Sequence, residues 1–140
     1  MDNKDIRWKQ RFQNFDKAFV LLRSAFDDKK IADFSQLEQE GIIQRFEYTY
    51  ELAWKTMKDY LQDNGIVILS EITARSVIKE AFSAKIIADG QVWINMMLHR
   101  NLLFHSYDFE KFREVLKAID EHYLAALSSF HEWLLERMID

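Results

Sequence analysis

The stretch SQLEQEGIIQRFEYTYELAWKTMKDYLQDNG, residues 35–65, has the pattern of one long amphipathic helix. Ser35 is followed three residues later by Glu38, which is the spacing of a capping box at the start of a helix. The Asn64-Gly65 pair is typical of a helix C-terminus. Between these signals, apolar side chains recur every three or four residues on one stripe: Ile42, Ile43, Phe46, Tyr50, Trp54, Met57 and Leu61. The stretch therefore predicts a helix with one buried face.

Four further helices are predicted on either side of this one. They cover residues 4–26, 73–87, 91–104 and 109–138, with Asp108 as the N-cap of the last. The apolar run 66–69 has no partner strand, so we interpret it as a buried connector. Long amphipathic helices joined by short loops are typical of a bundle. The prediction is an all-α, antiparallel up-and-down bundle of about five helices, formed by a single domain over residues 1–140.

The composition excludes several classes of protein. With 140 residues, no proline and 3 glycines, the chain lacks the turn residues of a sandwich or barrel. The absence of cysteine excludes disulfides, a thiol nucleophile and cysteine-ligated metals. A net charge of −4 argues against a broad basic surface for duplex DNA. Because there is no signal peptide and no apolar run near the roughly 18 residues of a membrane span, we expect a cytoplasmic protein.

The segment 91–107 departs from the amphipathic pattern. A helix as apolar as this one is either central in its bundle or covered by a second subunit. Arg100, Asn101 and His105 nevertheless fall inside the apolar arc, and buried polar groups without partners mark candidate sites. At 100° per residue the apolar side chains cover roughly 260° of the helical circle, namely Trp93, Ile94, Met96, Met97, Leu98, Leu102, Leu103, Phe104 and Tyr107.

Two interpretations of these polar residues follow from their chemistry. In the first, they form a structural network in which Arg100 pairs with an acid such as Glu47 or Glu51. In the second, they form a phosphate or RNA site. The planar fork of Arg100 suits a phosphate, His105 can move protons near neutral pH, and Asn101 can orient either group. Such a set, with the Tyr107 hydroxyl nearby, can assist attack of an RNA 2′-OH on its own phosphate without a metal or another cofactor.

The spacing of Arg100 and His105 raises a geometric problem. They are five residues apart, which is about 140° around a regular helix, so their side chains diverge. Either the helix ends or bulges near Phe104, or the site is shared by two subunits. We favour a symmetric homodimer, because it would also cover the excess apolar arc.

Two stretches of the chain resemble known families. Residues 100–107, RNLLFHSY, resemble the Arg-x4-His-x-Tyr motif of HEPN domains of the HepT type. Residues 46–55, FEYTYELAWK, resemble the signature of the nucleotidyltransferase substrate-binding protein family, and residues 76–97 are also similar to it. The resemblance covers nearly the whole chain. It implies a HEPN-like helical bundle, usually a homodimer, with a separate minimal nucleotidyltransferase as its partner.

For the HepT branch the resemblance implies a metal-independent ribonuclease toxin. Arg100, Asn101 and His105 would carry the catalysis. The partner would be an MntA-like antitoxin that silences the nuclease by transferring AMP to Tyr107. The added phosphates would place negative charge where an RNA phosphate must bind.

Two other functions remain open. The older interpretation of the family is a non-catalytic subunit that presents a substrate to the partner's nucleotidyl-transfer site. This chain has no Gly-Ser motif followed by paired aspartates, so it is not itself the transferase. The third possibility is a structural interaction module in which the Arg–His network only stabilises the dimer.

Two glutamates and three further histidines are the other titratable residues considered as site candidates. Glu47 and Glu51 are interpreted as a solvated border with nearby lysines, as paired carboxylates for acid–base work, or as the counter-charge of Arg100. His99 lies on the narrow polar strip and is interpreted as solvated. His122 and His131 are nine apart, which is not the spacing of a metal-binding pair.

Overall fold

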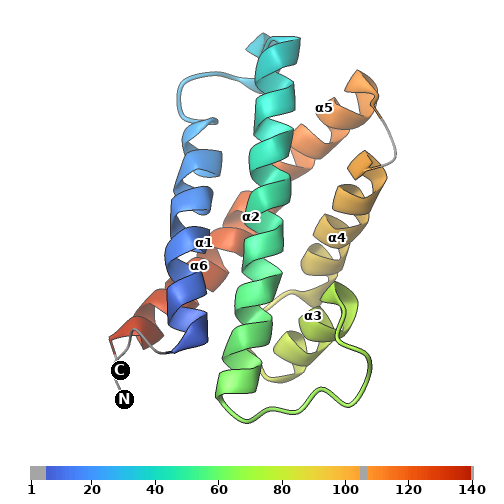
Figure 1. Ribbon diagram of the computed structural model, residues 1–140. Coiled ribbons are helices and arrows are strands. Elements are labelled where there is room, and N and C mark those ends of the chain that lie inside the picture. Colours follow the sequence, from blue (N-terminus) through green and yellow to red (C-terminus); the bar gives the residue numbers. More distant parts are fainter. Residues whose placement is uncertain (1–5, 105–106, 140) are drawn as a thin grey trace.

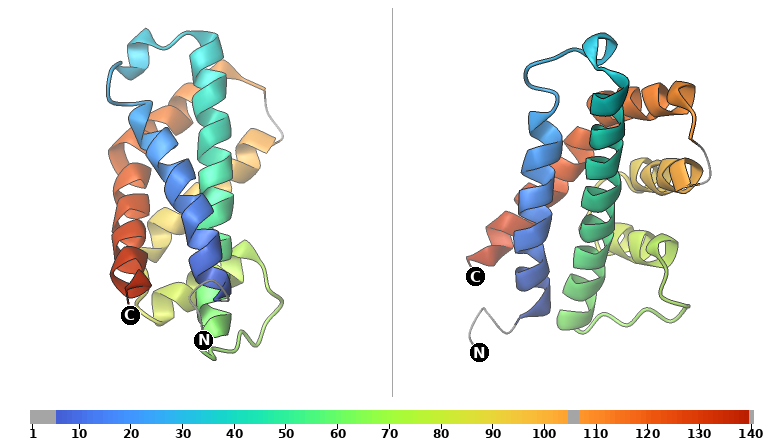
Figure 2. Two further views of the ribbon diagram at one scale, coloured as in Figure 1. Left: turned by 60° about the vertical axis from the view of Figure 1, so that its left-hand side comes forward. Right: turned by 45° about the horizontal axis from the view of Figure 1, so that its top comes forward.

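Helix α2, Gln36–Asp63, is the central element of the fold. The computed structural model describes residues 6–104 and 107–139. Helix α1, Arg7–Ser24, packs on one side of α2. Figure 2 shows α3, Ala74–Ser83, α4, Gly90–Phe104, and α5, Phe109–Ala118, on the other side. Each of these three helices contacts α2, which is therefore the element that α1, α3, α4 and α5 share as a neighbour.

The described residues are helical or irregular and contain no strand, as the sequence predicts. After α5 the chain continues through a π-helical turn, Ile119–Tyr123, into α6, Leu124–Met138. A short 3₁₀ turn, Ile31–Asp33, lies between α1 and α2. Helices α1, α2, α4 and the α5–α6 path alternate in direction, with α3 beside the end of α2 (Figure 1). The prediction of an all-α, up-and-down bundle is confirmed.

The two ends of α2 form as their sequence signals predict. The Ser35 hydroxyl accepts a hydrogen bond from the Glu38 N–H at 3.1 Å, and the Glu38 carboxylate accepts one from the Ser35 N–H at 2.9 Å. At the other end Gly65 has a φ of 74°. The Gly65 N–H donates to the Gln62 carbonyl and the Ile66 N–H to the Leu61 carbonyl, which is a Schellman motif.

Helix α3 is shorter than predicted, because a Schellman motif ends it at Ser83 rather than at residue 87. The Lys85 N–H donates to the Phe82 carbonyl, and the Ile86 N–H donates to the Ala81 carbonyl. Ile86 and Ile87 are buried, but they anchor the following loop instead of extending the helical stripe. Periodicity did not reveal this end, because the left-handed position holds a lysine with φ 62° rather than a glycine.

Two other sequence predictions were wrong in detail. The connector 66–69 is irregular, as expected, but it is only half-buried. Ile66 and Ile68 pack against the core, whereas Val67 is 72% and Leu69 98% exposed. It crosses the surface from the end of α2 to α3, where most loops lie. The single helix predicted over 109–138 is interrupted by the π-helical turn. This turn has more residues per turn than an α-helix, so the successive four-residue steps from Ile119 to Tyr123 and Leu127 stay on the buried face.

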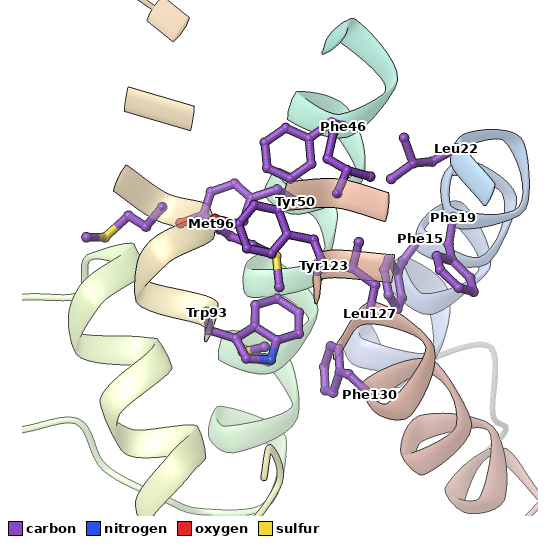
Figure 3. Close-up of a cluster of buried hydrophobic side chains, with 14 of the residues drawn as sticks. Phe15, Phe19, Leu22, Phe46, Tyr50, Trp93, Met96, Tyr123, Leu127 and Phe130 are labelled. Atoms are coloured by element: carbon purple, nitrogen blue, oxygen red, sulfur yellow. The ribbon is translucent and has the colours of Figure 1, made fainter. Parts of the chain in front are cut away.

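The core lies between α2 and the surrounding helices (Figure 3). Trp93 of α4 is 1% exposed and meets the Phe130 ring edge-on at 5.6 Å. The Phe46 and Tyr123 rings stack at 5.7 Å and connect α2 to the π-helical turn. The side chains labelled in Figure 3 are Phe15, Phe19, Leu22, Phe46, Tyr50, Trp93, Met96, Tyr123, Leu127 and Phe130. The aromatic stripes seen in the sequence are therefore core.

The two helix ends with a left-handed residue allow a paired stability test. We expect Lys85→Gly to raise the free energy of unfolding by about 1 kcal/mol, because glycine adopts a positive φ without steric cost. We expect Gly65→Ala to lower it by about 1 kcal/mol. A Cβ at Gly65 would meet no atom within 4 Å, so that loss comes from the backbone alone. Urea unfolding measures both changes, and a loss of stability in Lys85→Gly would contradict the assignment.

Candidate functional site

Arg100 lies near the C-terminal end of α4 and faces α2. Its Nε is 3.3 Å from Oε1 of Glu51, and the two side chains are 26% and 29% exposed. Its guanidinium carbon is 5.3 Å from the centre of the Phe104 ring. The predicted pairing of Arg100 with an α2 acid is therefore present, with Glu51 as the partner. The Arg100 Nε is buried and has no hydrogen-bond acceptor of good geometry among the described residues, which is a feature of candidate ligand sites.

Two carboxylates one helical turn apart on α2 surround this arginine. Glu51 also accepts a hydrogen bond from the Trp54 Nε1–H at 3.2 Å, and the Lys55 Nζ is 3.7 Å away. Burial raises the pKa of Glu47, while the charge of Arg100 acts in the opposite direction. Glu51 thus serves both as counter-charge to Arg100 and as part of the lysine-bearing border, so two of the sequence interpretations hold together.

An open groove of about 590 Å³ runs along α2 beside these carboxylates. Tyr48 in this groove is 59% exposed. The Arg45 guanidinium donates to the Leu21 carbonyl at 2.9 Å. The lining residues are Gly41, Gln44, Arg45, Glu47, Tyr48 and Glu51. The groove therefore combines a cation, an exposed aromatic face and the counter-ion of Arg100.

The other predicted site residues lie in different surroundings. Asn101 is exposed, so its expected place within a covered apolar arc does not hold in the single chain. Leu98, on the same outward side of α4, is 49% exposed, and Phe104 at the helix end is 67% exposed. The apolar excess of this helix is thus divided between the core and an open surface. His105 lies outside the described residues.

Tyr107 is accessible and has one polar partner among the residues that the structure describes. It is 76% exposed, and its hydroxyl donates a hydrogen bond to the Glu40 carboxylate on α2. That hydrogen bond raises the pKa of the Tyr107 phenol above its ordinary value, because the carboxylate favours the protonated form. The ring packs edge-on against Phe109 at 5.9 Å and Phe112 at 5.6 Å. The side chain predicted to be modified is therefore held in place with its oxygen at the surface.

His99 is not solvated, contrary to the sequence interpretation. Its Nδ1 is 2.6 Å from the Tyr123 hydroxyl, and its Nε2 is 4.0 Å from the Glu114 carboxylate. Burial lowers the pKa of His99, and burial raises the pKa of Tyr123 to about 12. The sequence carries no signal for this contact, because the π-helical turn that holds Tyr123 is not visible in the hydrophobic pattern.

We expect His99 to make stability fall as the pH is lowered. Its pKa is lower in the folded chain, so its contribution is fully present above the unfolded value of about 6.5 and is lost as the pH falls toward the folded pKa. His99→Gln keeps a polar group for Tyr123 but cannot titrate. Its melting temperature should therefore fall less than that of the parent between about pH 7.5 and pH 5.5.

The matched control for this pH dependence is His122→Gln, because the His122 side chain is 64% exposed. This variant should follow the parent. Thermal melting by circular dichroism measures the slopes, and equal slopes for the parent and His99→Gln would contradict the role of burial.

Neither a metal-binding cluster nor a membrane-spanning helix is found in the part of the chain that the structure describes. Within residues 6–104 and 107–139, no three histidine, aspartate or glutamate side chains gather closely enough to hold a metal ion. In the same residues, no helix combines the length and the apolarity needed to cross a bilayer. His131 and His122, whose spacing in the sequence is not that of a metal-binding pair, each lie next to a carboxylate. The His131 Nε2 is 2.6 Å from Asp16, and His122 lies beside Glu121.

The fold is an all-α bundle in which Arg100, near the end of α4, is paired with Glu51 of α2. The family model described as "nucleotidyltransferase substrate binding protein like" matches residues 10–136. The chain therefore belongs to this family.

The proteins similar to the chain include a curated relative and two solved structures. A Haemophilus influenzae protein named probable ribonuclease HepT is 35% identical over 100 residues, which is 70% of this chain and 65% of that protein. A structure from Haemophilus influenzae, described as the fold of a substrate binding domain of a nucleotidyltransferase, has a TM-score of 0.75 and 28% identity over 88% of this chain and 98% of that one. A structure from Thermus thermophilus has a TM-score of 0.67 and 26% identity over 89% of this chain and 98% of that one.

Proposed function

We propose that the protein is a HEPN-type, metal-independent ribonuclease and the toxin of a toxin–antitoxin pair. The observation that carries the proposal is the guanidinium of Arg100 near the end of α4, whose buried Nε is ion-paired with Glu51 but makes no hydrogen bond of good geometry with the described residues. The likeness to a protein named probable ribonuclease HepT supports the same activity. The groove along α2 supplies the exposed Tyr48, on which an unpaired base can stack.

The proposed reaction is transfer of an RNA phosphate to its own neighbouring 2′-oxygen. The 2′-OH attacks the phosphorus, the bond to the 5′-oxygen of the next nucleotide breaks, and a 2′,3′-cyclic phosphate and a 5′-OH end result. His105 takes the proton from the 2′-OH or returns one to the leaving oxygen. Arg100 stabilises the negative charge of the crowded phosphate, and Asn101 orients the phosphate or the imidazole.

A homodimer forms part of the proposal. The outward side of α4 leaves Leu98 and Phe104 exposed next to Asn101, while Arg100 faces inward. A two-fold axis through this side would cover the apolar groups and bring the two copies of the motif together. Sedimentation should give a dimeric mass at micromolar concentration, and a monomeric mass would contradict the dimer.

A minimal nucleotidyltransferase partner is the proposed regulator. It would transfer AMP to Tyr107, whose oxygen is at the surface. The added phosphate carries negative charge and would oppose binding of an RNA phosphate near Arg100. The family to which the chain belongs supports a partner of this kind.

The second candidate is a substrate-binding subunit without chemistry of its own. The likeness to a structure described as a substrate binding domain of a nucleotidyltransferase favours it. In that case the chain presents a third molecule to the transferase, and the Arg100–Glu51 pair is structural.

RNA cleavage by the chain alone separates the two candidates. The parent and His105→Ala are purified without a partner and incubated with total RNA in EDTA. Mass spectrometry confirms that Tyr107 is unmodified, and circular dichroism confirms that the variant is folded. Cleavage by the parent only, with 2′,3′-cyclic phosphate ends, is the expected result. Absence of cleavage by the unmodified parent would reject the ribonuclease and favour the substrate-binding subunit.

A further inference from the structure

The contact between Tyr107 and Glu40 joins the segment after α4 to the first turns of α2. The phenol donates its proton in a hydrogen bond to a carboxylate that lies 67 positions earlier in the chain. The Phe109 and Phe112 rings pack nearly perpendicular to the Tyr107 ring and, with the hydrogen bond to Glu40, orient this side chain although it is 76% exposed. A nucleophile that is accessible, oriented and hydrogen-bonded to a base has the arrangement that nucleophilic attack needs.

Glu40 differs from its neighbour Glu38 in what binds its carboxylate. Glu38 pairs with Lys29 at 2.8 Å and also accepts the Ser35 N–H that caps α2. Glu40 forms no ion pair within residues 6–104 and 107–139, and its described partner is the Tyr107 hydroxyl. The hydrogen bonds from Lys29 and Ser35 lower the pKa of Glu38 and hold it as a carboxylate, whereas no such contact is described for Glu40.

We propose that Glu40 is the general base that accepts the phenol proton of Tyr107 when this oxygen attacks the α-phosphorus of a nucleoside triphosphate. The proposal rests on the AMP transfer to Tyr107 proposed above. The bond between the Tyr107 oxygen and the α-phosphorus forms, and the bond from that phosphorus to the bridging oxygen breaks. Pyrophosphate leaves, and the proton passes to the Glu40 carboxylate and then to solvent. No oxidant or reductant is needed.

The chemistry of a phenol explains why a base is needed. A tyrosine has an ordinary pKa of about 10 and is therefore protonated at neutral pH. Here the hydrogen bond to Glu40 raises the pKa of Tyr107 further, so little free phenolate exists. A carboxylate beside a triphosphate is also repulsive until it becomes neutral by accepting the proton. Transfer of the proton to Glu40 therefore makes it easier for the Tyr107 oxygen to bond to phosphorus. A positioned general base contributes about 10²- to 10⁴-fold in rate.

The alternative role of Glu40 is a restraint that only holds Tyr107. Glu40→Gln distinguishes the two roles by the sign of its effect. The amide oxygen of glutamine still accepts a hydrogen bond but is a far weaker base. If Glu40 is the base, the variant reacts more slowly. If Glu40 only restrains the phenol, loss of its charge lowers the pKa of Tyr107 and leaves reactivity unchanged or increased.

The test uses an alkyl fluorophosphonate as the phosphorus electrophile. The Tyr107 oxygen displaces fluoride from its phosphorus directly, so no partner protein is needed. The full-length parent, Glu40→Gln, Glu110→Gln and Tyr107→Phe are labelled at neutral pH, and peptide mass spectrometry follows Tyr107. Glu110→Gln is the matched control, since it removes one carboxylate from the first turn of α5, three residues from Tyr107. Tyr107→Phe gives the background. Melting curves verify that each variant is folded.

We expect labelling of Tyr107 to be about 10²-fold slower in Glu40→Gln than in the parent and in Glu110→Gln. Equal or faster labelling of Glu40→Gln, or no labelling of the parent at Tyr107, would overturn the role of Glu40. A second arm repeats the variants with the purified nucleotidyltransferase partner, ATP and magnesium. If the parent takes up no AMP while the fluorophosphonate result holds, the proposed AMP transfer to Tyr107 is rejected, but the role of Glu40 as a base is retained. If the parent and Glu40→Gln take up AMP equally, the role of Glu40 as a base is rejected, but the proposed AMP transfer to Tyr107 is supported.

Discussion

Replacing Arg100 with alanine is expected to lower the rate of RNA cleavage in EDTA by about 10²- to 10³-fold, the usual effect of removing a donor that stabilises transition-state charge. The guanidinium is the cation that α4 places beside the groove along α2. Its loss leaves Glu47 and Glu51 next to the RNA phosphate without a compensating charge. Initial rates on a fluorescent single-stranded RNA measure the effect.

Two variants give the prediction for Arg100 its controls. Arg100→Lys keeps the charge but loses the planar fork, so we expect an intermediate rate. Arg113→Ala removes an exposed arginine from α5 and should cleave like the parent, because it changes the net charge equally without touching the site. Unchanged cleavage by a folded Arg100→Ala protein would exclude Arg100 from the chemistry and favour a structural Arg–Glu pair.

The largest loss of stability is expected for Trp93→Ala. Truncation of a buried large side chain lowers the free energy of unfolding by about 3–5 kcal/mol, because apolar contacts are lost and a cavity remains. Trp93 is 1% exposed and packs edge-on against Phe130, so α4 and α6 both lose a contact. Small domains have a total stability of about 5–15 kcal/mol, which makes this change a large fraction of it.

Urea unfolding with Leu135→Ala as the control measures this loss. Leu135 lies on α6 but is 53% exposed, so its truncation should change the stability by no more than about 0.5 kcal/mol. A loss below about 1 kcal/mol in Trp93→Ala would show that α4 does not depend on the core, contrary to the packing in Figure 3.

Local signals in the sequence determined most of the helices. The bounds of α2 follow from a capping box at Ser35 and a glycine at residue 65, and both act through backbone groups within a few positions. The apolar stripes identified the buried faces, because one helical period links spacing to direction. Arg100 stood out as a candidate for the same reason, since it interrupts an apolar arc. The end of α3 at Ser83 and the π-helical turn were not predicted, because neither has a glycine or a change of period to mark it.

Only the tertiary structure decided which residues meet. A stripe gives the direction in which a side chain points, but it contains no information on the element that lies opposite. The sequence therefore left Glu47 and Glu51 equivalent as partners of Arg100, and the packing of α4 on α2 placed Glu51 at its Nε. The contacts of His99 with Tyr123 and of Tyr107 with Glu40 join positions 24 and 67 residues apart. Such contacts depend on how the helices pack around α2, and no pattern within a single helix encodes them.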